Sequence, residues 1–191
     1  SVVLDGEDYL QLSPRIGDTS GFTFAAWVWW NGGSNWQRIF DFGADTSNYL
    51  AMTPKAGATG GLRFMMRNGG GEQVLNAAAL TANVWTHVAV TVGGGTGKLF
   101  VNGVLVNTNN AMSIQPVSVG TKFNYLGRSQ FPADPLFNGR LDDVRIVSSA
   151  VSDAAIAAMV ATGPPQFSAT VLTKGGAVRR QVFTGTLAGD A

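Results

Sequence analysis

The chain lacks cysteine altogether, and its 191 residues include one histidine and only two glutamates. The absence of cysteine excludes disulfides, thiolate-bound metals and thiol catalysis. It does not decide the cellular compartment, but it argues against a disulfide-stapled extracellular module of animal type. A zinc site needs several nitrogen or sulfur ligands, so the single histidine, His87, cannot form one without partners.

An excess of charge of one sign and long apolar runs are also lacking. The 13 Lys and Arg and 12 Asp and Glu residues give a net charge of +1 and are scattered along the chain. Such a balance provides no field that would attract a polyanion, so nucleic acid is not an expected partner. No apolar run approaches the roughly 20 residues of a membrane-spanning helix, and no signal-peptide pattern opens the chain. We expect a soluble chain without membrane insertion, with any export signal already absent.

What is abundant points to strands. The 25 glycines and the apolar fraction of 45% suit short strands and tight turns. Apolar residues alternate with others over residues 22–28, 62–67 and 87–92, which predicts half-buried antiparallel strands. Asn102-Gly103 between two apolar triplets is the strongest hairpin signal, and prolines place residues 130–138 in a loop. We expect these side chains in the core: Phe24, Val28, Phe40, Phe64, Val88, Val90 and Val101.

One short helix is predicted near the C-terminus. Ser152 is a suitable N-cap, the alanine-rich residues 153–160 follow, and Gly163 is a suitable terminator. The segment before this helix, FNGRLDDVRI (residues 137–146), resembles the closing signature of bacterial laminin-G-like domains of the concanavalin A-like lectin/glucanase superfamily. Five further segments are similar to the family in order and spacing: residues 3–10, 22–28, 36–43, 85–91 and 99–103. The resemblance covers residues 1–162 and implies an all-β, two-sheet antiparallel jelly-roll sandwich.

Residues 163–191 differ in character from the rest. Pro164 and Pro165 close the first domain, and residues 167–191 resemble the opening of a cadherin- or immunoglobulin-like module of the kind found in tandem in large bacterial proteins. The segment is too short to fold alone, so we expect the chain to be part of a larger multidomain protein. Residues 171–178 are expected to form a hairpin that packs on the sandwich or on a neighbouring chain.

The carboxylates do not form a glycosidase pattern. Retaining glycosidases need two carboxyl groups about 5–5.5 Å apart and inverting ones about 6.5–9.5 Å apart. The family's glucanases carry Glu and Asp at alternate positions of one strand, whereas Glu7 and Glu72 lie in separate predicted loops. Asp142 and Asp143 are adjacent, so a regular strand points them to opposite faces. We predict a non-catalytic domain.

The resemblance implies a structural calcium ion where the opening loop approaches the closing strand. Ca²⁺ takes 6 to 8 oxygen ligands, including carboxylates and backbone carbonyls. Asp5 and Asp142 are the first candidates for ligands, and Asp143 and Asp8 the next. The alternative is that Asp142 and Asp143 cap turns or pair with Arg140 and Arg145.

Aromatic and polar residues suggest a sugar-binding surface. We expect Trp29, Trp30 and Trp36 to be exposed beside a glycine-rich loop, where they would stack on sugar rings, and Trp27 and Trp85 to pack structurally. The polar candidates are Arg38, Asp41, Arg128 and Gln130, which would bind sugar hydroxyls or hold one another in a buried network. His87, Arg63 and Arg67 would join them if their strands are neighbours; otherwise His87 packs on a tryptophan.

Three functions remain open at this point. The first is a non-catalytic carbohydrate-binding module of a secreted or cell-surface bacterial protein, with a glycan or polysaccharide as partner. The second is an adhesion or spacer module that contacts protein or extends a stalk. The third is a glucanase, against which the carboxylates argue. The fold alone does not choose among them.

Overall fold

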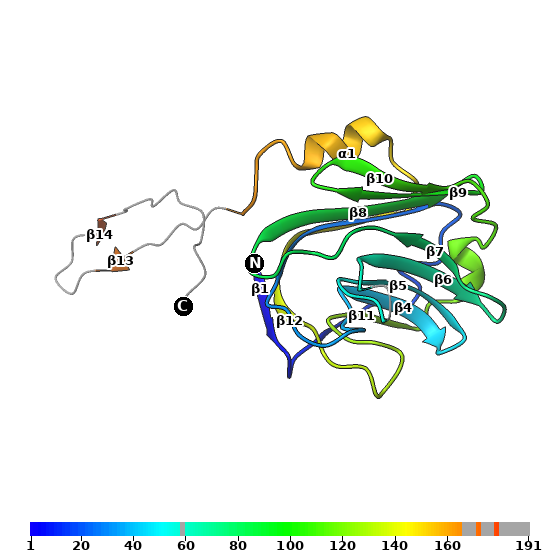
Figure 1. The fold of residues 1–191 in the computed structure, drawn as a ribbon, viewed down its shortest axis with the longest axis horizontal. Coiled ribbons are helices and arrows are strands. Elements are labelled where there is room, and N and C mark those ends of the chain that lie inside the picture. The colour runs from blue at the N-terminus through cyan, green and yellow to red at the C-terminus, as the bar shows by residue number, and fades with distance from the viewer. Residues whose placement is uncertain (58–59, 166–170, 173–177, 180–191) are drawn as a thin grey trace.

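The protein is a sandwich of two six-stranded antiparallel sheets with one helix on its outside (Figure 1). The computed structural model describes residues 1–57 and 60–165, and beyond these only the backbone of residues 171–172 and 178–179. Every strand pairing within the two sheets is antiparallel. The predicted two-sheet sandwich with a short C-terminal helix is therefore confirmed.

The strand order shows that chain neighbours are often not sheet neighbours. The first sheet runs in the order β1 (Val2–Asp5), β12 (Asn138–Val147), β3 (Phe22–Trp30), β8 (Trp85–Gly93), β9 (Thr96–Val101) and β10 (Val104–Asn109). The second sheet runs in the order β2 (Leu10–Leu12), β11 (Phe123–Leu126), β4 (Phe40–Asp45), β5 (Asn48–Thr53), β6 (Arg63–Asn68) and β7 (Gln73–Asn76). A 3-10 turn, η1 (Pro116–Val119), precedes β11.

The core lies between the two sheets and follows the predicted alternation. Phe24 and Val28 of β3 face Phe40 of β4, and the rings of Phe24 and Phe40 stack at 4.2 Å between centroids. Of the seven predicted core residues, six are fully buried in this cluster, and Val101 is partly buried against it. Burial of such a side chain contributes roughly 1.5–3 kcal/mol to folding by transfer from water.

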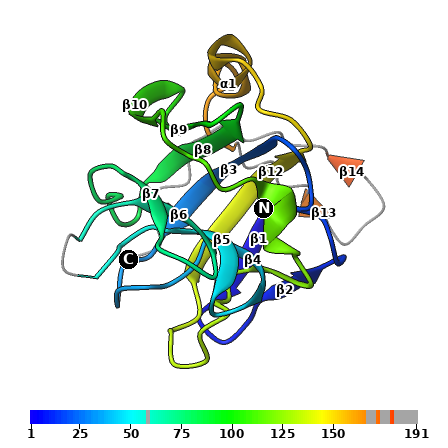
Figure 2. The ribbon, with the colours of Figure 1, turned by 90° about the vertical axis from the view of Figure 1, so that its right-hand side faces the viewer.

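The outer face of the first sheet is covered as well. All nine residues of β3 are buried, so the expectation of a half-buried strand is wrong for β3. The reason is the helix α1 (Asp153–Met159) together with its flanking segments and the tryptophans of the outer face. The helix lies on the outside of β8 and β9 in both views (Figures 1 and 2), and Trp27 and Trp29 pack on Trp85 and Val160. Ile156 of the helix packs on Ala25, Ala89 and Phe100 of that outer face.

Local sequence signals set the turns and the helix as expected. Ser152 caps α1 by accepting a hydrogen bond from the Ala155 N–H at 3.2 Å. Asn102 and Gly103 have φ of 49° and 78° and join β9 to β10 in a tight hairpin. A Cβ on Gly103 would lie 2.7 Å from Val160 Cγ2, so the hairpin also needs glycine to fit beneath the end of α1.

The C-terminal segment is described only in part. The backbone of β13 (Val171–Leu172) pairs antiparallel with β14 (Val178–Arg179), which agrees with the predicted hairpin. The predicted module over residues 167–191 otherwise lies outside the described residues. Within the described part of the chain, no helix combines the length and apolar character needed to cross a membrane.

Candidate functional site

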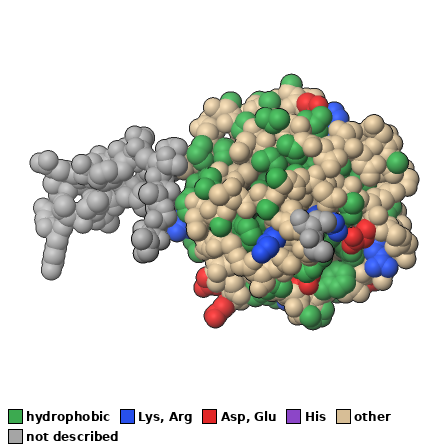
Figure 3. All heavy atoms as spheres, viewed as in Figure 1, with side chains coloured by type: hydrophobic (Ala, Val, Ile, Leu, Met, Phe, Trp, Pro, Cys, Tyr) green, Lys and Arg blue, Asp and Glu red, His purple; other side chains and the backbone are tan. Residues whose placement is uncertain are grey.

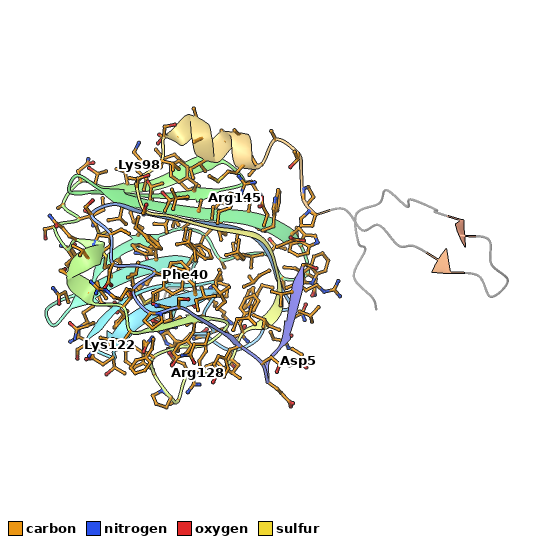
Figure 4. All side chains as sticks on the ribbon, turned by 180° about the vertical axis from the view of Figure 1, so that it is seen from behind. Asp5, Phe40, Lys98, Lys122, Arg128 and Arg145 are labelled. Atoms are coloured by element: carbon orange, nitrogen blue, oxygen red, sulfur yellow. The ribbon has the colours of Figure 1, made fainter. Side chains whose placement is uncertain are left out.

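The outer face of the second sheet carries a mixed row of side chains, and no α-helix of the described residues covers it. Tyr125, Asp41, Ala51 and Met65 are successive cross-strand partners on β11, β4, β5 and β6. Phe40 lies between the sheets, with Lys98 and Arg145 on the side of α1 and Arg128 on the opposite side (Figure 4). On the side of the sandwich seen in Figure 3, basic and acidic side chains are interspersed without a continuous patch of one sign. The outer face of the second sheet is the candidate functional surface.

A hollow of about 330 Å³ opens on this face. Its floor comes from β5 and β6, and its walls from the loops that precede β4 and β12. It is lined by Trp36, Arg38, Tyr49, Met65, Arg67, Glu72, Phe131 and Asp134. Aromatic surface and charged hydrogen-bonding groups are thus combined in one concave site, as is typical of small-ligand sites.

The floor of the hollow is apolar and well packed. Tyr49, Ala51 and Met65 are buried there, and Trp36 and Phe131 pack against them from the two walls. Phe131 meets Tyr49 edge to face at 5.6 Å between ring centroids. The Tyr49 hydroxyl donates to the exposed Glu72 carboxylate, and burial together with this carboxylate raises the pKa of Tyr49. The phenol is therefore neutral at physiological pH and acts as a hydrogen-bonding group.

The partly buried Trp36 is held in an unusual backbone conformation. Its φ is 70°, in the left-handed region that a bulky residue rarely adopts. The Arg38 and Arg63 guanidinium carbons lie 5.5 and 5.9 Å from its ring centroid. A Cβ on Gly57 would lie 2.7 Å from Trp36 Cζ2, so glycine at this position lets the ring lie against the neighbouring loop. Several elements thus fix the orientation of this indole.

A buried charge network fixes the two walls to the sheet. Arg38 is 2% exposed, and its guanidinium pairs with Asp41 at 3.3 Å and with Asp134 at 2.9 Å. Asp41 also accepts the Gln130 N–H at 3.1 Å, and the Ser129 hydroxyl donates to Asp134 at 2.8 Å. Burial raises the pKa of Asp41 to about 7, although Arg38 and the Gln130 N–H lower it. Two roles were predicted for these residues, sugar binding or a buried network. In the structure Arg38, Asp41 and the Gln130 N–H form the buried network.

Arg63 and Arg67 keep donors free on the same face. Arg67 Nε donates to the Gly70 carbonyl at 2.8 Å, and Arg63 Nε donates to Asn76 Oδ1 at 2.8 Å. Neither forms an ion pair with a carboxylate in residues 1–57 or 60–165. A guanidinium has five N–H donors, so each retains several for a ligand.

Arg128 lies at the other edge of the face, apart from the network. Its guanidinium carbon is 4.6 Å from the Tyr9 ring centroid and 5.1 Å from that of Tyr125. The expectation that it joins Arg38 and Asp41 is therefore wrong. Gln130 bridges the two regions, because its side-chain amide donates to the Phe123 carbonyl at 2.7 Å while its N–H reaches Asp41.

Comparison with known proteins agrees with this architecture. The family model described as "Concanavalin A-like lectin/glucanases superfamily" matches residues 4–157.

The chain belongs to the concanavalin A-like lectin/glucanases superfamily.

Solved structures of low sequence identity share this superfamily fold. Domain 4 of AbnA, an extracellular arabinanase from Geobacillus stearothermophilus solved with arabinotriose, has 20% identity and a TM-score of 0.70, over 82% of this chain and 74% of that one. The CBM40 of a Ruminococcus gnavus sialidase, solved with α2,3-sialyllactose, has 17% identity and a TM-score of 0.65, over 80% and 96%.

A further match is part of a larger enzyme. The NanB sialidase of Streptococcus pneumoniae has 17% identity and a TM-score of 0.70, and the match covers 90% of this chain but only 29% of the sialidase. No curated protein matches the chain in sequence. At these identities the structural matches establish the fold and not the ligand.

Two of the three tryptophans predicted to be exposed are buried in this superfamily domain. Trp29 is 6% exposed and Trp30 is 5% exposed, so the prediction is wrong for both. The reason is that β3 extends to Trp30, two residues beyond the predicted strand. Trp30 points into the core and its Nε1 donates to Gln37 Oε1 at 2.7 Å, whereas Trp29 packs on Trp85 outside the first sheet. Trp27 and Trp85 are buried as predicted, at 6% each.

His87 is also on the wrong sheet for the expected grouping. It lies on β8 of the first sheet, whereas Arg63 and Arg67 lie on β6 of the second. It is 1% exposed and meets Trp27 edge to face at 5.4 Å, which agrees with the alternative of a histidine packed on tryptophan. Burial lowers the pKa of His87 to about 4, so the imidazole is neutral at physiological pH.

The aspartates expected to share a calcium ion are not gathered. Asp5 pairs with Asn138 and Val2 with Leu141, so Asp142 lies at the far end of β1 from Asp5. At about 3.3 Å per residue the two are separated by roughly 13 Å. One ion bound by both does not fit this geometry. No group of three or more acids, histidines or cysteines in the described residues could hold a metal.

The individual aspartates have other partners. Asp143 pairs with Arg145 at 2.8 Å, Asp5 accepts the Glu7 N–H at 3.0 Å, and Asp142 accepts the Asp143 N–H at 2.7 Å. These contacts are those of the alternative interpretation, in which the aspartates cap turns and pair with arginine. Asp8 is exposed in the loop between β1 and β2. A structural calcium remains a prediction, without the ligand pair proposed for it.

Several residues of the site were not predicted. Tyr49, Met65, Glu72, Phe131 and Asp134 line the hollow, and none was a candidate from the sequence. The signal available for Tyr49 was alternation in residues 48–53, where Leu50 and Met52 are core residues and Tyr49 and Ala51 point outward. Phe131 and Asp134 lie in a proline-rich loop, whose position only the folded chain defines.

Proposed function

We propose that this chain is a non-catalytic, lectin-like carbohydrate-binding module. The observation that carries the proposal is the hollow on the outer face of the second sheet. It combines the partly exposed Trp36 ring with the free donors of Arg67 and the polar ends of Tyr49 and Glu72. Sugars present both C–H faces that stack on aromatic rings and hydroxyls that need hydrogen-bond partners.

Similar folds from bacterial enzymes support the proposal. The Ruminococcus gnavus module was solved with sialyllactose and the Geobacillus stearothermophilus domain with arabinotriose. Both are named as parts of glycan-processing enzymes. By analogy, we propose that this module belongs to a secreted or cell-surface bacterial protein, and that its partner is a glycan or polysaccharide.

The carboxylates near the hollow favour binding over hydrolysis. Asp41 has the raised pKa of a general acid, and Asp134 is close to it through Arg38 and Ser129. However, Asp41 is 0% exposed and does not line the hollow, so a substrate in the hollow cannot reach it. Asp134 is engaged by Arg38, and Glu72 by Tyr49. We therefore assign these groups to support of the loops.

A second candidate function is contact with another protein, as an adhesion or spacer module. The observation in its favour is β10, an edge strand of the first sheet with three consecutive exposed apolar residues. Val104, Leu105 and Val106 are 64%, 41% and 44% exposed. An apolar edge of this kind is a known template for pairing with another chain.

Isothermal titration against a panel that includes arabinotriose and α2,3-sialyllactose tests the carbohydrate proposal. For a sugar that binds, Trp36→Ala and Arg67→Ala should each weaken binding at least tenfold while circular dichroism remains unchanged. Arg15→Ala is the matched control, because the Arg15 side chain is 81% exposed and lies outside the hollow. If no sugar binds at millimolar concentration, or if the control is as damaging as Arg67→Ala, the protein-contact function replaces the sugar-binding one.

A further inference from the structure

A second aromatic cluster lies on the same sheet face as the hollow. We call it the tyrosine shelf; it consists of Tyr9, Tyr125 and Arg128. The two tyrosine rings meet edge to face, with 5.6 Å between centroids and an interplanar angle of 90°. Tyr9 is 39% exposed, and the partly buried Arg128 covers both rings. The shelf therefore presents aromatic surface and a guanidinium together at the β2 edge of the sheet.

Register places the shelf in line with the hollow. Tyr125 on β11 is paired with Asp41 on β4, and Asp41 with Ala51 on β5, which belongs to the floor of the hollow. Two strand spacings of about 4.8 Å each separate Tyr125 from that floor, or roughly 10 Å. The loop with Ser129 and Gln130 lies between the two sites. A ligand lying across the strands would meet both.

The polar groups of the shelf have no hydrogen-bond partner among the residues that the structure describes. Across residues 1–57 and 60–165, Arg128 has neither an ion pair nor a hydrogen bond, and the hydroxyls of Tyr9 and Tyr125 have no hydrogen bond. Five guanidinium N–H donors and two phenols are thus available to a ligand. This matches the many hydroxyls of a sugar.

Charge near the shelf argues against an anionic ligand. Three exposed acids precede Tyr9: Asp5 at the end of β1, and Glu7 and Asp8 in the loop that follows. Figure 4 shows Asp5 and Arg128 on the same lower side of the molecule. Three carboxylates near one guanidinium leave no net positive field to attract a carboxylate or a phosphate. A neutral group that stacks and accepts hydrogen bonds fits better.

We propose that the tyrosine shelf is a second sugar-binding subsite, and that the ligand is a neutral oligosaccharide chain extending across the strands from the hollow to β2. The inference rests on the proposed function, because it requires that the hollow binds sugar. Linking two weak contacts through one chain raises the affinity for long chains over short ones, since the second contact becomes intramolecular.

The test is a length series measured by isothermal titration. The probes are arabinotriose and arabinohexaose, or the trimer and hexamer of whichever neutral sugar the panel returns. The hexamer should bind about tenfold more tightly than the trimer. Tyr9→Ala and Arg128→Ala should lower hexamer affinity to the level of the trimer and leave trimer affinity unchanged. Trp36→Ala should weaken binding of both.

Two matched controls separate binding from folding. Arg15→Ala controls for loss of an arginine, and Val104→Ala for loss of exposed apolar surface on the opposite sheet; both should leave the length dependence intact. Tyr125→Ala is informative only if its melting temperature is unchanged. Tyr9→Ala keeps the test decisive, because the ring is 39% exposed and contributes little to the core.

The outcomes distinguish this inference from the function on which it rests. Equal affinity for trimer and hexamer, or a loss in Tyr9→Ala that is the same for both, overturns the second subsite and leaves the hollow as a sugar site. Absence of binding to every sugar overturns both proposals. Concentration-dependent self-association that Tyr9→Ala abolishes, measured by analytical ultracentrifugation, would show that a second copy of the chain occupies the shelf instead.

Discussion

Trp30 and Trp36 are six residues apart, yet they have different roles. Trp30 ends β3 in the first sheet, and Trp36 lies in the loop that leads to β4 in the second sheet. Trp30 points into the core and is 5% exposed. Trp36 lies beyond the chain reversal, on the wall of the hollow. The buried Trp30 should therefore determine stability, and the partly exposed Trp36 should determine binding.

We expect Trp30→Ala to lower the free energy of unfolding by about 3–5 kcal/mol, the usual cost of removing a buried aromatic side chain. The change also leaves the buried Gln37 amide without its 2.7 Å hydrogen bond. Urea unfolding followed by circular dichroism measures the effect. Trp36→Ala serves as the comparison, and a larger loss in that variant than in Trp30→Ala would contradict our assignment of the two residues.

His87 should make stability fall in mild acid. Its pKa is about 4 in the folded protein, against 6.5 for the free side chain, because burial disfavours the imidazolium. As pH falls from 6.5 towards 4, the unfolded chain gains a proton that the folded protein does not. The folded state therefore loses up to about 3 kcal/mol over this window. Unfolding free energies of wild type and His87→Phe, measured from pH 7 to 4, should diverge by this amount; parallel profiles would exclude the effect.

Asp41 should make stability fall as pH rises, which is the opposite of the effect of His87. Its pKa of about 7 lies above the ordinary value of 3.8, so between these pH values the folded protein holds a proton that the unfolded chain lacks. Stability from this group is present below pH 3.8 and is lost as pH rises to 7, by up to about 4 kcal/mol. The difference in unfolding free energy between wild type and Asp41→Asn should change by that amount. A difference that is constant with pH would show that Arg38 keeps Asp41 ionised.

At the scale of elements, the loops before β4 and β12 position the site, and their geometry depends on glycine and buried charge. Arg38 holds both loops through Asp41 and Asp134. Gly57 touches the Trp36 ring from a third segment. The sheet supplies only the floor, so the walls of the hollow are set by contacts between distant parts of the chain.

Gly57→Ala should weaken sugar binding without unfolding the domain. The new Cβ would lie 2.7 Å from Trp36 Cζ2, so the indole must shift from its place beside Arg38 and Arg63. We expect a drop in affinity of about tenfold, with a melting temperature within about two degrees of wild type. Gly70→Ala is a suitable control, because no atom lies within 4 Å of a Cβ at that position. Equal affinities for the two variants would show that the orientation of Trp36 does not matter.

At the scale of the whole molecule, the two sheets carry different outer faces. The helix and its flanking segments bury the outside of β3 and β8, while the outside of β4, β5 and β6 holds the hollow. The protein therefore has one face that stabilises it and one that is available to a ligand. The difference comes from where the chain goes after β12.

Chelation tests the calcium prediction at this scale. An ion that binds only the folded state raises the melting temperature by mass action. If the prediction is right, excess EDTA lowers the melting temperature, and an unchanged melting temperature excludes a structural calcium. The ligands cannot be Asp5 and Asp142 together, because these lie at opposite ends of β1. Differential scanning calorimetry with and without added Ca²⁺ gives the answer. A drop of several degrees in EDTA would show that the fold binds calcium through other ligands, with backbone carbonyls among them.

The two-sheet architecture was predicted from the sequence through its resemblance to laminin-G-like domains, and local signals located several of its elements. Period-2 alternation identified the core faces of β3, β6 and β8, and the Asn102-Gly103 turn and the Ser152 cap marked a hairpin and the helix. These signals are local, because strand period, turn conformation and helix capping depend on residues close together in the chain. For the same reason the buried network around Arg38 and Asp41, which are three residues apart, could be proposed in advance.

Only the tertiary structure decided whether the outer face of each strand is covered and which side chains meet. The sequence could not show that β3 extends to Trp30 or that Trp29 packs on Trp85, so Trp29 could not be distinguished from Trp36. It could not place His87 and Arg63 on different sheets, nor bring Phe131 onto Tyr49 across 82 residues of sequence. Strand order in a jelly roll joins segments far apart in the chain, and no local pattern encodes that pairing. The site is built from such long-range contacts. Most of its residues could therefore not be predicted, although the fold of the domain could.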